Sequence, residues 1–339
     1  MRGVVFPGDR RAEVREFPDP EPGPGEVVVE MRVGGLCGSD LHRYRQTAAQ
    51  RVGMDIIQGH EPSGVVYAVG EGVRRVRPGD RVSVYHYRGC GHCKQCLAGN
   101  IMWCPERRGY GGPIHGSCAD YILTDERNCM PLPAELTFAD GALMACTAGT
   151  AFSAMRRLKA SGEETVVVFG LGPVGLTGLL MAKAMGARVI GVEPIADRRA
   201  LAHEFGADET LDPTDTDVVA AIQDLTRGEG ADLAYETSGK PAGRKSTAEC
   251  LRVEGRAVFV GLGMQTEPSD WHPMIVKQLS LLGSYVIPIY LYFDMVDFIL
   301  EHKLPLGRMV THRFPIEAAA EAFRVFDQGQ TGKVILEWA

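Results

Sequence analysis

Short apolar runs separated by turn signals make up the chain as far as about residue 145. VVVEMRV and SGVVYAV are two of these runs, and PGPGE and RPGDR are two of the breaks. Apolar runs of this length, bounded by Gly, Pro and Asp, are typical of β-strands. This part of the chain is therefore predicted to be mainly β.

From about residue 164 the pattern changes to strands that alternate with helices. The predicted strands are TVVVFG, RVIGVE, ADLAYETSG, RAVFVG and LSLLGSYV. The predicted helices are PVGLTGLLMAKAMG, ADRRALAHEFG and residues 241–252. Such alternation indicates a parallel sheet covered by helices. The closing segment has two helical patterns, FDMVDFILEHKL and EAAAEAFRVF, and a final strand, KVILEW, which fit either part of the chain.

Composition is that of an ordinary globular protein with room for two domains. The chain has 339 residues, of which 45% are hydrophobic and 23% charged. A net charge of −7 argues against nucleic acid as a partner. Nine cysteines, an odd number, and an N-terminus without a signal-peptide pattern predict a cytoplasmic protein. Residues 278–293 are uncharged but too short to span a membrane, so they are predicted to form a buried strand leading into an interface or pocket.

A glycine-rich motif follows the TVVVFG strand and opens the next helix. It reads Gly170-Leu-Gly172-Pro173-Val174-Gly175, which matches the dinucleotide-binding pattern in the context that pattern requires. The glycines permit a tight turn and a close approach of the backbone to a pyrophosphate at the helix N-terminus. The alternative is a plain strand-to-helix turn.

An acidic residue at the expected distance supports the dinucleotide interpretation. Glu193 ends RVIGVE, and its carboxylate is suited to the adenosine ribose hydroxyls and repels a 2′-phosphate. NAD is therefore favoured over NADP. Arg198 and Arg199 follow closely and are a possible phosphate contact, although a solvated helix face is the preferred interpretation for both.

Four cysteines are concentrated in residues 90–104. Cys90, Cys93, Cys96 and Cys104 supply four soft thiolates at spacings that let one loop wrap a tetrahedral ion. Zinc is the first choice, an iron–sulfur cluster is the rival, and disulfides are disfavoured by compartment. Four protein ligands leave no open position, so the site is predicted to be structural; His92 is an unneeded fifth candidate.

A second set of side chains that can bind a metal ion is scattered along the chain. Cys37, Ser39, Asp40 and His42 lie close together in sequence, and His60-Glu61 follows downstream. Each has an ordinary alternative, since Cys37 fits a buried apolar position, His60 a core histidine and Asp40 a turn or cap. A catalytic metal needs ligands that leave one position open.

Taken together, these motifs resemble those of the zinc-dependent medium-chain dehydrogenase/reductase family, which includes alcohol and polyol dehydrogenases. The matching motifs follow the family order and cover the chain almost end to end. They are LCGSDLH (36–42), GHEPSGVV (59–66), the four-cysteine segment (90–104), CTAGTAFSA (146–154) and VVVFGLGPVG (166–175).

The resemblance implies an α/β protein with a Rossmann domain, a doubly wound parallel sheet, and a mainly β, GroES-like catalytic domain. The expected boundaries are 1–148 with 289–339 for the catalytic domain and 149–288 for the dinucleotide-binding domain. Two zinc ions per chain and a homodimer or homotetramer are implied too, with pairing through the strands near LSLLGSYV.

The same resemblance assigns roles to individual residues. Cys37, His60 and Cys146 would bind the catalytic zinc, with Glu61 behind the metal and entering its coordination during exchange. Ser39 would take the substrate proton, His42 would pass it to solvent, and Asp40 would fix the tautomer of the histidine ligand. The cofactor site would comprise the loop residues and two side chains that follow them: Gly170, Gly172, Pro173, Val174, Gly175, Glu193 and Arg198.

Three departures from the family pattern carry information. Cys146 stands where polyol and threonine dehydrogenases tend to have a carboxylate, which favours an alcohol dehydrogenase-like ligand set. Gly38 replaces an arginine for the pyrophosphate, a contact for which Lys333 is the candidate, with a surface lysine as the alternative. Residues 85–87 align with the pocket wall, and they fit either a hydroxylated substrate or core packing.

The predicted function is hydride transfer between a small alcohol and NAD, with a zinc-bound alkoxide formed near neutral pH. The alternatives are a zinc-free double-bond reductase of the same superfamily and a zinc-ribbon protein that binds nucleic acid. No nucleic acid or membrane partner is expected. Cys118, Cys129 and Cys250 are predicted to be packing residues.

Overall fold

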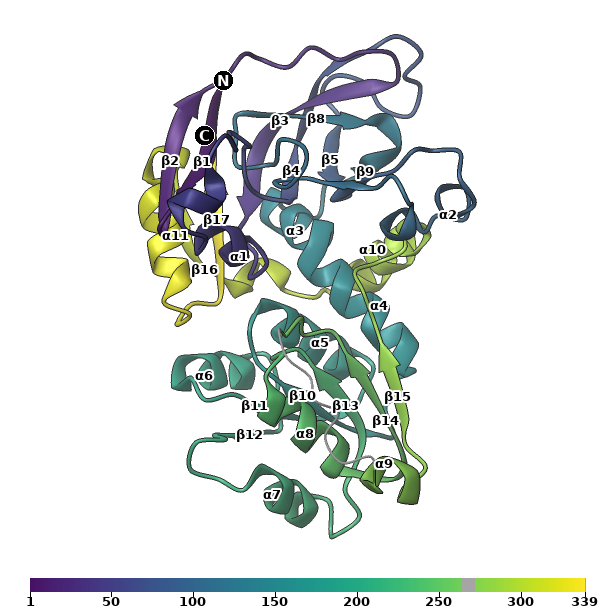
Figure 1. The fold of residues 1–339 in the computed structure, drawn as a ribbon. Coiled ribbons are helices and arrows are strands. Elements are labelled where there is room, and N and C mark those ends of the chain that lie inside the picture. Colours follow the sequence, from purple (N-terminus) through teal and green to yellow (C-terminus); the bar gives the residue numbers. More distant parts are fainter. Residues whose placement is uncertain (264–271, 339) are drawn as a thin grey trace. The chain divides into compact units, whose positions relative to one another are not determined.

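The computed structural model describes residues 1–263 and 272–338 and divides the chain into two compact units (Figure 1). The first unit comprises Met1–Gly149, Pro288–Val296 and Pro305–Ala339. The second comprises Thr150–Ile287 and Asp297–Leu304. The expected range 149–288 includes residues 264–271, which lie outside the described residues. Helix α10 (Tyr292–Glu301) contributes to both units.

The first unit is built on a seven-stranded sheet in the order β16-β17-β3-β4-β5-β9, with β8 paired to β3. Two two-stranded antiparallel sheets, β1-β2 and β6-β7, complete its strands. The strands are β1 (Arg2–Gly8), β2 (Arg11–Glu16), β3 (Glu26–Gly35), β4 (Glu61–Val69), β5 (Arg81–Val84), β6 (Tyr87–Arg88), β7 (Arg108–Gly109), β8 (Tyr121–Asp125), β9 (Cys129–Pro131), β16 (Val310–Phe314) and β17 (Lys333–Glu337). The prediction of a mainly β region is confirmed.

Apolar side chains of these strands form the core of the first unit. Val27, Val29 and Met31 of β3 are fully buried beside residues of β4, β5 and β8. A second cluster joins β1 and β17 to helix α11. The helices of this unit are α1 (Asp40–Tyr44), α2 (Lys94–Leu97), α3 (Phe138–Leu143) and α11 (Ala319–Asp327).

The second unit is a six-stranded parallel sheet in the order β12-β11-β10-β13-β14-β15. Its strands are β10 (Thr165–Phe169), β11 (Arg188–Val192), β12 (Glu209–Leu211), β13 (Ala231–Glu236), β14 (Leu251–Phe259) and β15 (Ser280–Gly283). Its helices are α4 (Gly149–Leu158), α5 (Pro173–Ala184), α6 (Ala196–Glu204), α7 (Val218–Leu225), α8 (Pro241–Glu249) and α9 (His272–Val276). This strand order is that of the Rossmann fold, so the predicted fold class is confirmed.

Two local predictions need correction. The helix expected over residues 241–252 ends at Glu249, because Leu251 is fully buried and already pairs with Ala231 as the start of β14. The strand expected to be buried in 278–293 is β15, which lies at the edge of the sheet with both ends exposed. An edge strand has a paired neighbour on one side only, which explains its exposure.

Three cysteines without a motif lie in hydrophobic cores, as predicted. Cys118, Cys129 and Cys250 have at most 1% of their surface exposed and pack among apolar side chains. All nine cysteines carry free thiols. Among the described residues, every helix is too short or too polar to cross a bilayer.

Candidate functional site

Three strand ends of the first unit converge at one point of its sheet. Gly35, the last residue of β3, is paired with Glu61, the first residue of β4, and also with Ile335 of β17. Because both pairings are antiparallel, the chain just after β3 lies next to the starts of β4 and β17. This register places Cys37, His60 and Lys333 in one neighbourhood although they are far apart in sequence.

Cys146, which also lies in this neighbourhood, comes from an irregular helical turn. Cys146 lies in a π-helical segment, η4 (Met144–Ala148), which directly continues α3. Helix α3 begins with a capping box in which Thr137 and Asp140 exchange hydrogen bonds. Single π-turns inside helices occur often at functional sites, because the widened turn redirects side chains.

The structure brings four predicted metal-ligating residues together. One ligand atom from each lies within 4.8 Å of the others, and three of the four residues are buried. The residues are Cys37, His60, Glu61 and Cys146. Two thiols and an imidazole are ligands that zinc prefers, and three such ligands leave a fourth position for a small molecule.

Asp40 orients the imidazole of this group. Its Oδ1 lies 3.0 Å from His60 Nδ1, and its Oδ2 accepts the Cys37 backbone N–H at 2.9 Å. His60 Nδ1 therefore donates to Asp40, so Nε2 is the ring nitrogen that would bind a metal once it has lost its proton. The carboxylate of Asp40 is fully buried, so this orientation is held firmly.

Ser39 lies next to the metal-ligating atoms. Its Oγ is 3.5 Å from Cys37 Sγ and 3.3 Å from His60 Nε2. His42 is exposed on α1, and within the described chain no hydrogen bond joins it to Ser39. The structure thus places one member of the predicted proton relay at the site and the other on the nearby surface.

The two thiols of the group differ in acidity. A hydrogen bond from Cys146 lowers the pKa of Cys37 well below its usual value, against the effect of burial. The same bond and burial raise the pKa of Cys146. Although burial opposes it, the charges of Asp40 and Cys37 raise the pKa of His60. One thiolate is therefore favoured even before a cation adds its own charge.

Glu61 is held by a buried lysine, a contact that the sequence did not reveal. Lys333 Nζ forms an ion pair with Glu61 Oε2 and donates to Thr147 Oγ1 at 3.1 Å. Thr147 Oγ1 in turn donates to Glu61 Oε1 at 3.1 Å. Lys333 is only 1% exposed, so it is not a surface lysine, and its charge is directed at Glu61.

The carboxyl group of Glu61 and the ammonium group of Lys333 both have shifted pKa values. Burial raises the pKa of Glu61 to about 7, although Lys333 counters part of that rise. Burial alone would lower the pKa of Lys333, but Glu61 and Cys37 outweigh it and raise the value. Because Lys333 engages Glu61, the other three residues of the group, Cys37, His60 and Cys146, are the candidate ligand set.

Residues 85–87 lie beside this group. The His86 ring is 5.9 Å from the His60 ring, centroid to centroid, and its Nδ1 lies 2.6 Å from the Ala145 carbonyl oxygen. Nδ1 therefore donates, and Nε2 is left as an acceptor. Burial lowers the pKa of His86 to about 4, so its imidazole is neutral.

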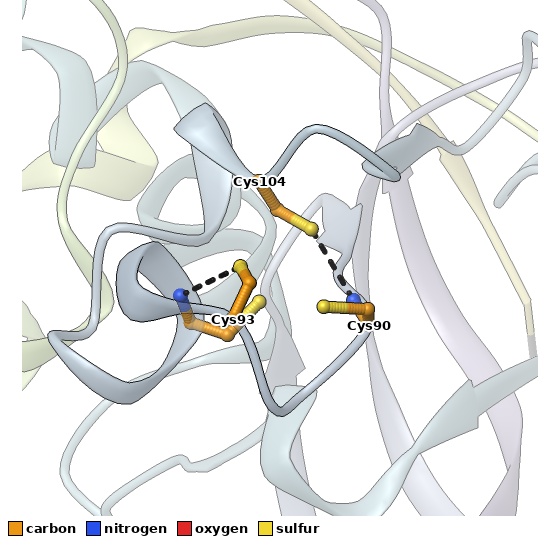
Figure 2. A group of neighbouring side chains, drawn as sticks. Cys90, Cys93 and Cys104 are labelled. Carbon is orange, nitrogen blue, oxygen red and sulfur yellow. Dashed lines mark hydrogen bonds between the residues drawn. The ribbon is translucent and has the colours of Figure 1, made fainter.

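The Cys90–Cys104 group is formed by one continuous segment (Figure 2). Sulfur atoms of Cys90, Cys93, Cys96 and Cys104 lie within 4.8 Å of one another. Cys93 Sγ accepts the Cys96 N–H at 3.5 Å at the start of α2, and Cys104 Sγ accepts the Cys90 N–H at 3.3 Å. Bonds of this kind, from backbone N–H to sulfur, stabilise thiolates.

His92 does not join the four sulfurs as a buried ligand. It is exposed, and its Nδ1 lies 3.1 Å from the Cys90 carbonyl oxygen. It can form a separate, looser group with Cys90 and the exposed Glu106.

The four thiols differ in acidity. The backbone N–H of Cys96 lowers the pKa of Cys93 to about 7. The pKa of Cys90 is lowered as well, by the backbone N–H of His92, whereas burial raises the pKa of Cys96 to about 12. Four thiols of one segment suit a closed tetrahedral zinc site.

The glycine-rich loop of the second unit connects β10 to α5. Gly170 has a φ of +86°, and a Cβ at Gly175 would overlap with the Gly170 carbonyl oxygen. A Cβ at Gly172 would instead meet only Arg198 Nη1, at 4.0 Å. The turn thus needs its first and third glycines for packing, while its second leaves the backbone open to a phosphate at the N-terminus of α5.

Glu193 is tied to this loop. Its Oε2 accepts the Leu171 N–H at 2.8 Å and lies 3.8 Å from Arg198 Nη1. Arg199 donates to the Glu193 carbonyl oxygen at 2.6 Å and pairs with Asp212 at 2.9 Å. The expectation of a solvated helix face for the two arginines is therefore wrong, since both are partly buried against the end of β11.

Comparisons with known proteins agree with this architecture. The family model of the alcohol dehydrogenase GroES-like domain matches residues 23–134, and that of zinc-binding dehydrogenases matches residues 173–301. The zinc-type alcohol dehydrogenase-like protein YphC of Escherichia coli, itself uncharacterized, is 35% identical over 100% of this chain and 99% of its own. An L-threonine 3-dehydrogenase of Saccharopolyspora erythraea is 33% identical over 96% of this chain and 95% of its own.

A solved structure shows the same fold across the whole chain. The crystal structure of an NAD-dependent alcohol dehydrogenase has a TM-score of 0.89 at 32% identity and covers 100% of both chains. A GroES-like unit and a Rossmann unit in one chain define an oxidoreductase of the alcohol dehydrogenase type. The chain belongs to the zinc-dependent medium-chain dehydrogenase/reductase family.

Proposed function

We propose that the protein is a zinc-dependent dehydrogenase that transfers hydride between a small alcohol and NAD. The observation that carries this proposal is the convergence of Cys37, His60 and Cys146, with Asp40 fixing the imidazole tautomer. Two thiolates and one neutral imidazole balance the charge of Zn²⁺ and leave a position open for an oxygen of the substrate. When bound, zinc would act as a Lewis acid on the alcohol oxygen.

The residues around the ligands have separate tasks in this proposal. Ser39 Oγ, close to Cys37 and His60, accepts the alcohol proton as its own hydroxyl proton leaves through the cofactor ribose, and the exposed His42 would pass that proton to solvent. Lys333 holds the Glu61 carboxylate, so that Glu61 joins the ligands only when this ion pair opens.

The cofactor would bind to the second unit, for which residues 149–288 are the proposed domain. The pyrophosphate would lie on Gly170–Gly175, and the adenosine ribose would meet the carboxylate of Glu193. That carboxylate is 4% exposed and already oriented by the Leu171 N–H. Its negative charge favours NAD over NADP, whereas Arg198 lies beside the loop where it can neutralise the pyrophosphate.

The Cys90–Cys104 group would hold a second, structural zinc ion. All four ligands are thiols of one segment, which leaves no position for a substrate. This ion would stabilise the loop between β6 and β7. The enzyme would thus bind two zinc ions with different roles.

The side chains beside the proposed active site favour a substrate with a further hydroxyl group. His86 directs a neutral imidazole acceptor from a buried position next to His60. A polyol satisfies such an acceptor, whereas a simple alkanol leaves it unpaired, at a cost in binding. An amino alcohol is the second candidate, since one relative is an L-threonine 3-dehydrogenase.

Zinc content and turnover test this proposal together. The purified protein is expected to contain about two zinc ions per chain and to reduce NAD with members of a panel of alkanols, polyols, cyclitols and amino alcohols. Cys37→Ser is expected to lose one zinc ion and at least about 10³-fold in kcat/KM while keeping its fold. Cys250→Ser, which changes a thiol in the core of the second unit, is the control and is expected to keep both ions.

Each alternative gives a different result. A zinc-free double-bond reductase contains no zinc, and a zinc-ribbon protein contains one ion per chain. An active Cys37→Ser enzyme contradicts the proposed ligand set.

The exposed edge of β15 also supports pairing with a second copy of the chain, and light scattering would then give the mass of a dimer or tetramer.

A further inference from the structure

An ion pair between a fully buried carboxylate and a partly buried guanidinium lies at the carboxyl edge of the parallel sheet, outside the site described above. Glu236 ends β13, its side chain is fully buried, and its Oε2 lies 4.0 Å from Nε of Arg244 on α8. Neither Glu236 Oε2 nor Arg244 Nη1 has a hydrogen-bond partner among residues 1–263 and 272–338. Charge attraction, rather than a hydrogen bond, therefore joins Glu236 Oε2 to the guanidinium of Arg244.

The pair is connected to the two loops that follow β13 and β14. Glu236 Oε1 accepts the Ser238 hydroxyl at 2.5 Å and the Gly239 N–H at 2.9 Å in the first loop, residues 237–240. Arg244 Nη2 donates to the Gly261 carbonyl oxygen at 2.7 Å in the second loop, residues 260–263. One ion pair thus fixes both loops at once.

The two loops also pack directly, backbone against backbone. A Cβ at Gly261 would overlap with the Gly239 nitrogen, and a Cβ at Gly263 would overlap with the Gly239 carbonyl oxygen. The first loop continues to the glycine-rich motif, because Thr237 Oγ1 donates to the Gly170 carbonyl oxygen at 2.8 Å. These contacts form a continuous network from the loop after β10 to the loop after β14.

The sheet order indicates which part of a dinucleotide would meet these loops. Parallel α/β sheets bind ligands at the carboxyl ends of their strands, where the strand order reverses. Here the reversal lies between β10 and β13. With the adenosine ribose at Glu193 after β11 and the pyrophosphate after β10, the other half of the dinucleotide extends over the ends of β13 and β14.

We infer that Glu236 and Arg244 are positioning residues that hold loops 237–240 and 260–263 in place for the nicotinamide half of the cofactor. The inference rests on the proposed dinucleotide function. A role in packing alone would be served at lower cost by uncharged side chains of similar size, since burying a charged pair carries a desolvation penalty. The paired charges instead fix two loops in one arrangement before the cofactor binds.

Binding of two ligands to the full-length protein tests this inference. NADH reaches both halves of the proposed site, whereas ADP-ribose lacks the nicotinamide. Glu236→Gln is expected to raise the Kd of NADH by about tenfold, measured by fluorescence titration, and to leave the Kd of ADP-ribose within about twofold, measured by calorimetry. Ser238→Ala, a smaller change that removes one bond to Glu236, is expected to weaken NADH binding by about threefold.

Asp232→Asn is the matched control. Asp232 lies at the opposite end of β13 and pairs with Arg252 at 2.6 Å. Both ligands are expected to bind this variant as they bind the wild type. Equal weakening of NADH and ADP-ribose by Glu236→Gln, or unchanged NADH binding, would overturn the inference. Wild-type protein that binds neither ligand would overturn the dinucleotide function itself, and the inference with it.

Discussion

The two cysteine groups of the first unit use the same ligand atom in different ways. The Cys90–Cys104 group draws four thiols from one segment, and three of its four cysteines are partly exposed. The second group takes Cys37, His60 and Cys146 from three separate segments and lies among buried charged residues. One is a local structure, and the other depends on the complete fold of the unit.

This difference explains the expected chemistry of each group. Four thiolates would complete a tetrahedron around a zinc ion, so the first group would leave no position for a substrate. Two thiolates and an imidazole leave one position open, and the polar groups near them can take part in proton transfer. The neighbours differ accordingly, since Cys93 and Cys104 accept backbone N–H groups, whereas His60 is fixed by the side chain of Asp40.

Cys93→Ser should give the largest effect on stability. Loss of one thiolate is expected to remove the structural zinc, because a site formed by a single loop has little else to hold it. Zinc content is expected to fall from about two ions to one, and the midpoint of thermal unfolding by on the order of 10 °C. Activity measured well below that temperature is expected to remain, in contrast to Cys37→Ser.

Cys129→Ser serves as the control for this prediction. Cys129 is a buried thiol of the same unit that packs in an apolar core. Its replacement is expected to cost about 1–2 kcal/mol of unfolding free energy without any change in zinc content. If Cys93→Ser retained two zinc ions per chain, the assignment of the structural site would be wrong.

Local patterns were sufficient to predict most of the fold. The alternation that begins with TVVVFG gave the Rossmann sheet, because each strand and helix there has its own periodicity and turn signals. The predicted burial of β15 was wrong, since an apolar composition does not show whether a strand lies inside a sheet or at its edge. That distinction depends on which strands pair, which is a property of the whole sheet.

The candidate site shows the same limit. Cys37, His60 and Cys146 were proposed from the family motifs, and the structure brings them together. The buried pair of Lys333 and Glu61 was not predicted, because a lysine at the start of an apolar strand ordinarily lies at the surface. Only the register of β3 with β4 and β17 places Lys333 next to Glu61.

Lys333→Met should give the next largest effect and sharpen the contrast between the groups. Removing the ammonium leaves the Glu61 carboxylate buried without its counter-charge. Burial already raises the pKa of Glu61 to about 7, so the cost is largest in alkaline solution, where the wild-type carboxylate is ionised. There the free energy of unfolding is expected to fall by about 3–5 kcal/mol, measured by urea denaturation, and by less at acidic pH, where Glu61 takes up a proton. The Cys90–Cys104 group has no equivalent dependence on a distant charge, so its zinc ion is expected to stay bound.

The double variant Lys333→Met/Glu61→Gln separates charge from packing. If the cost of Lys333→Met arises from the unpaired carboxylate, removing that charge is expected to restore more than half of the lost stability. Equal stability of the single and double variants would mean that the ion pair contributes little. The buried charges around the second group would then contribute little to the stability of the unit.

His92→Ala should give the smallest effect and tests whether the first group is made of thiols alone. The His92 ring is exposed and its Nδ1 lies 3.1 Å from the carbonyl oxygen of Cys90, so its loss is expected to change the unfolding free energy by less than about 0.5 kcal/mol. Zinc content is expected to stay at about two ions per chain, whereas Cys96→Ser at the neighbouring turn lowers it to one. A His92→Ala protein with one zinc ion would make His92 a ligand, because loss of an exposed, uninvolved imidazole cannot release a metal held by four thiolates.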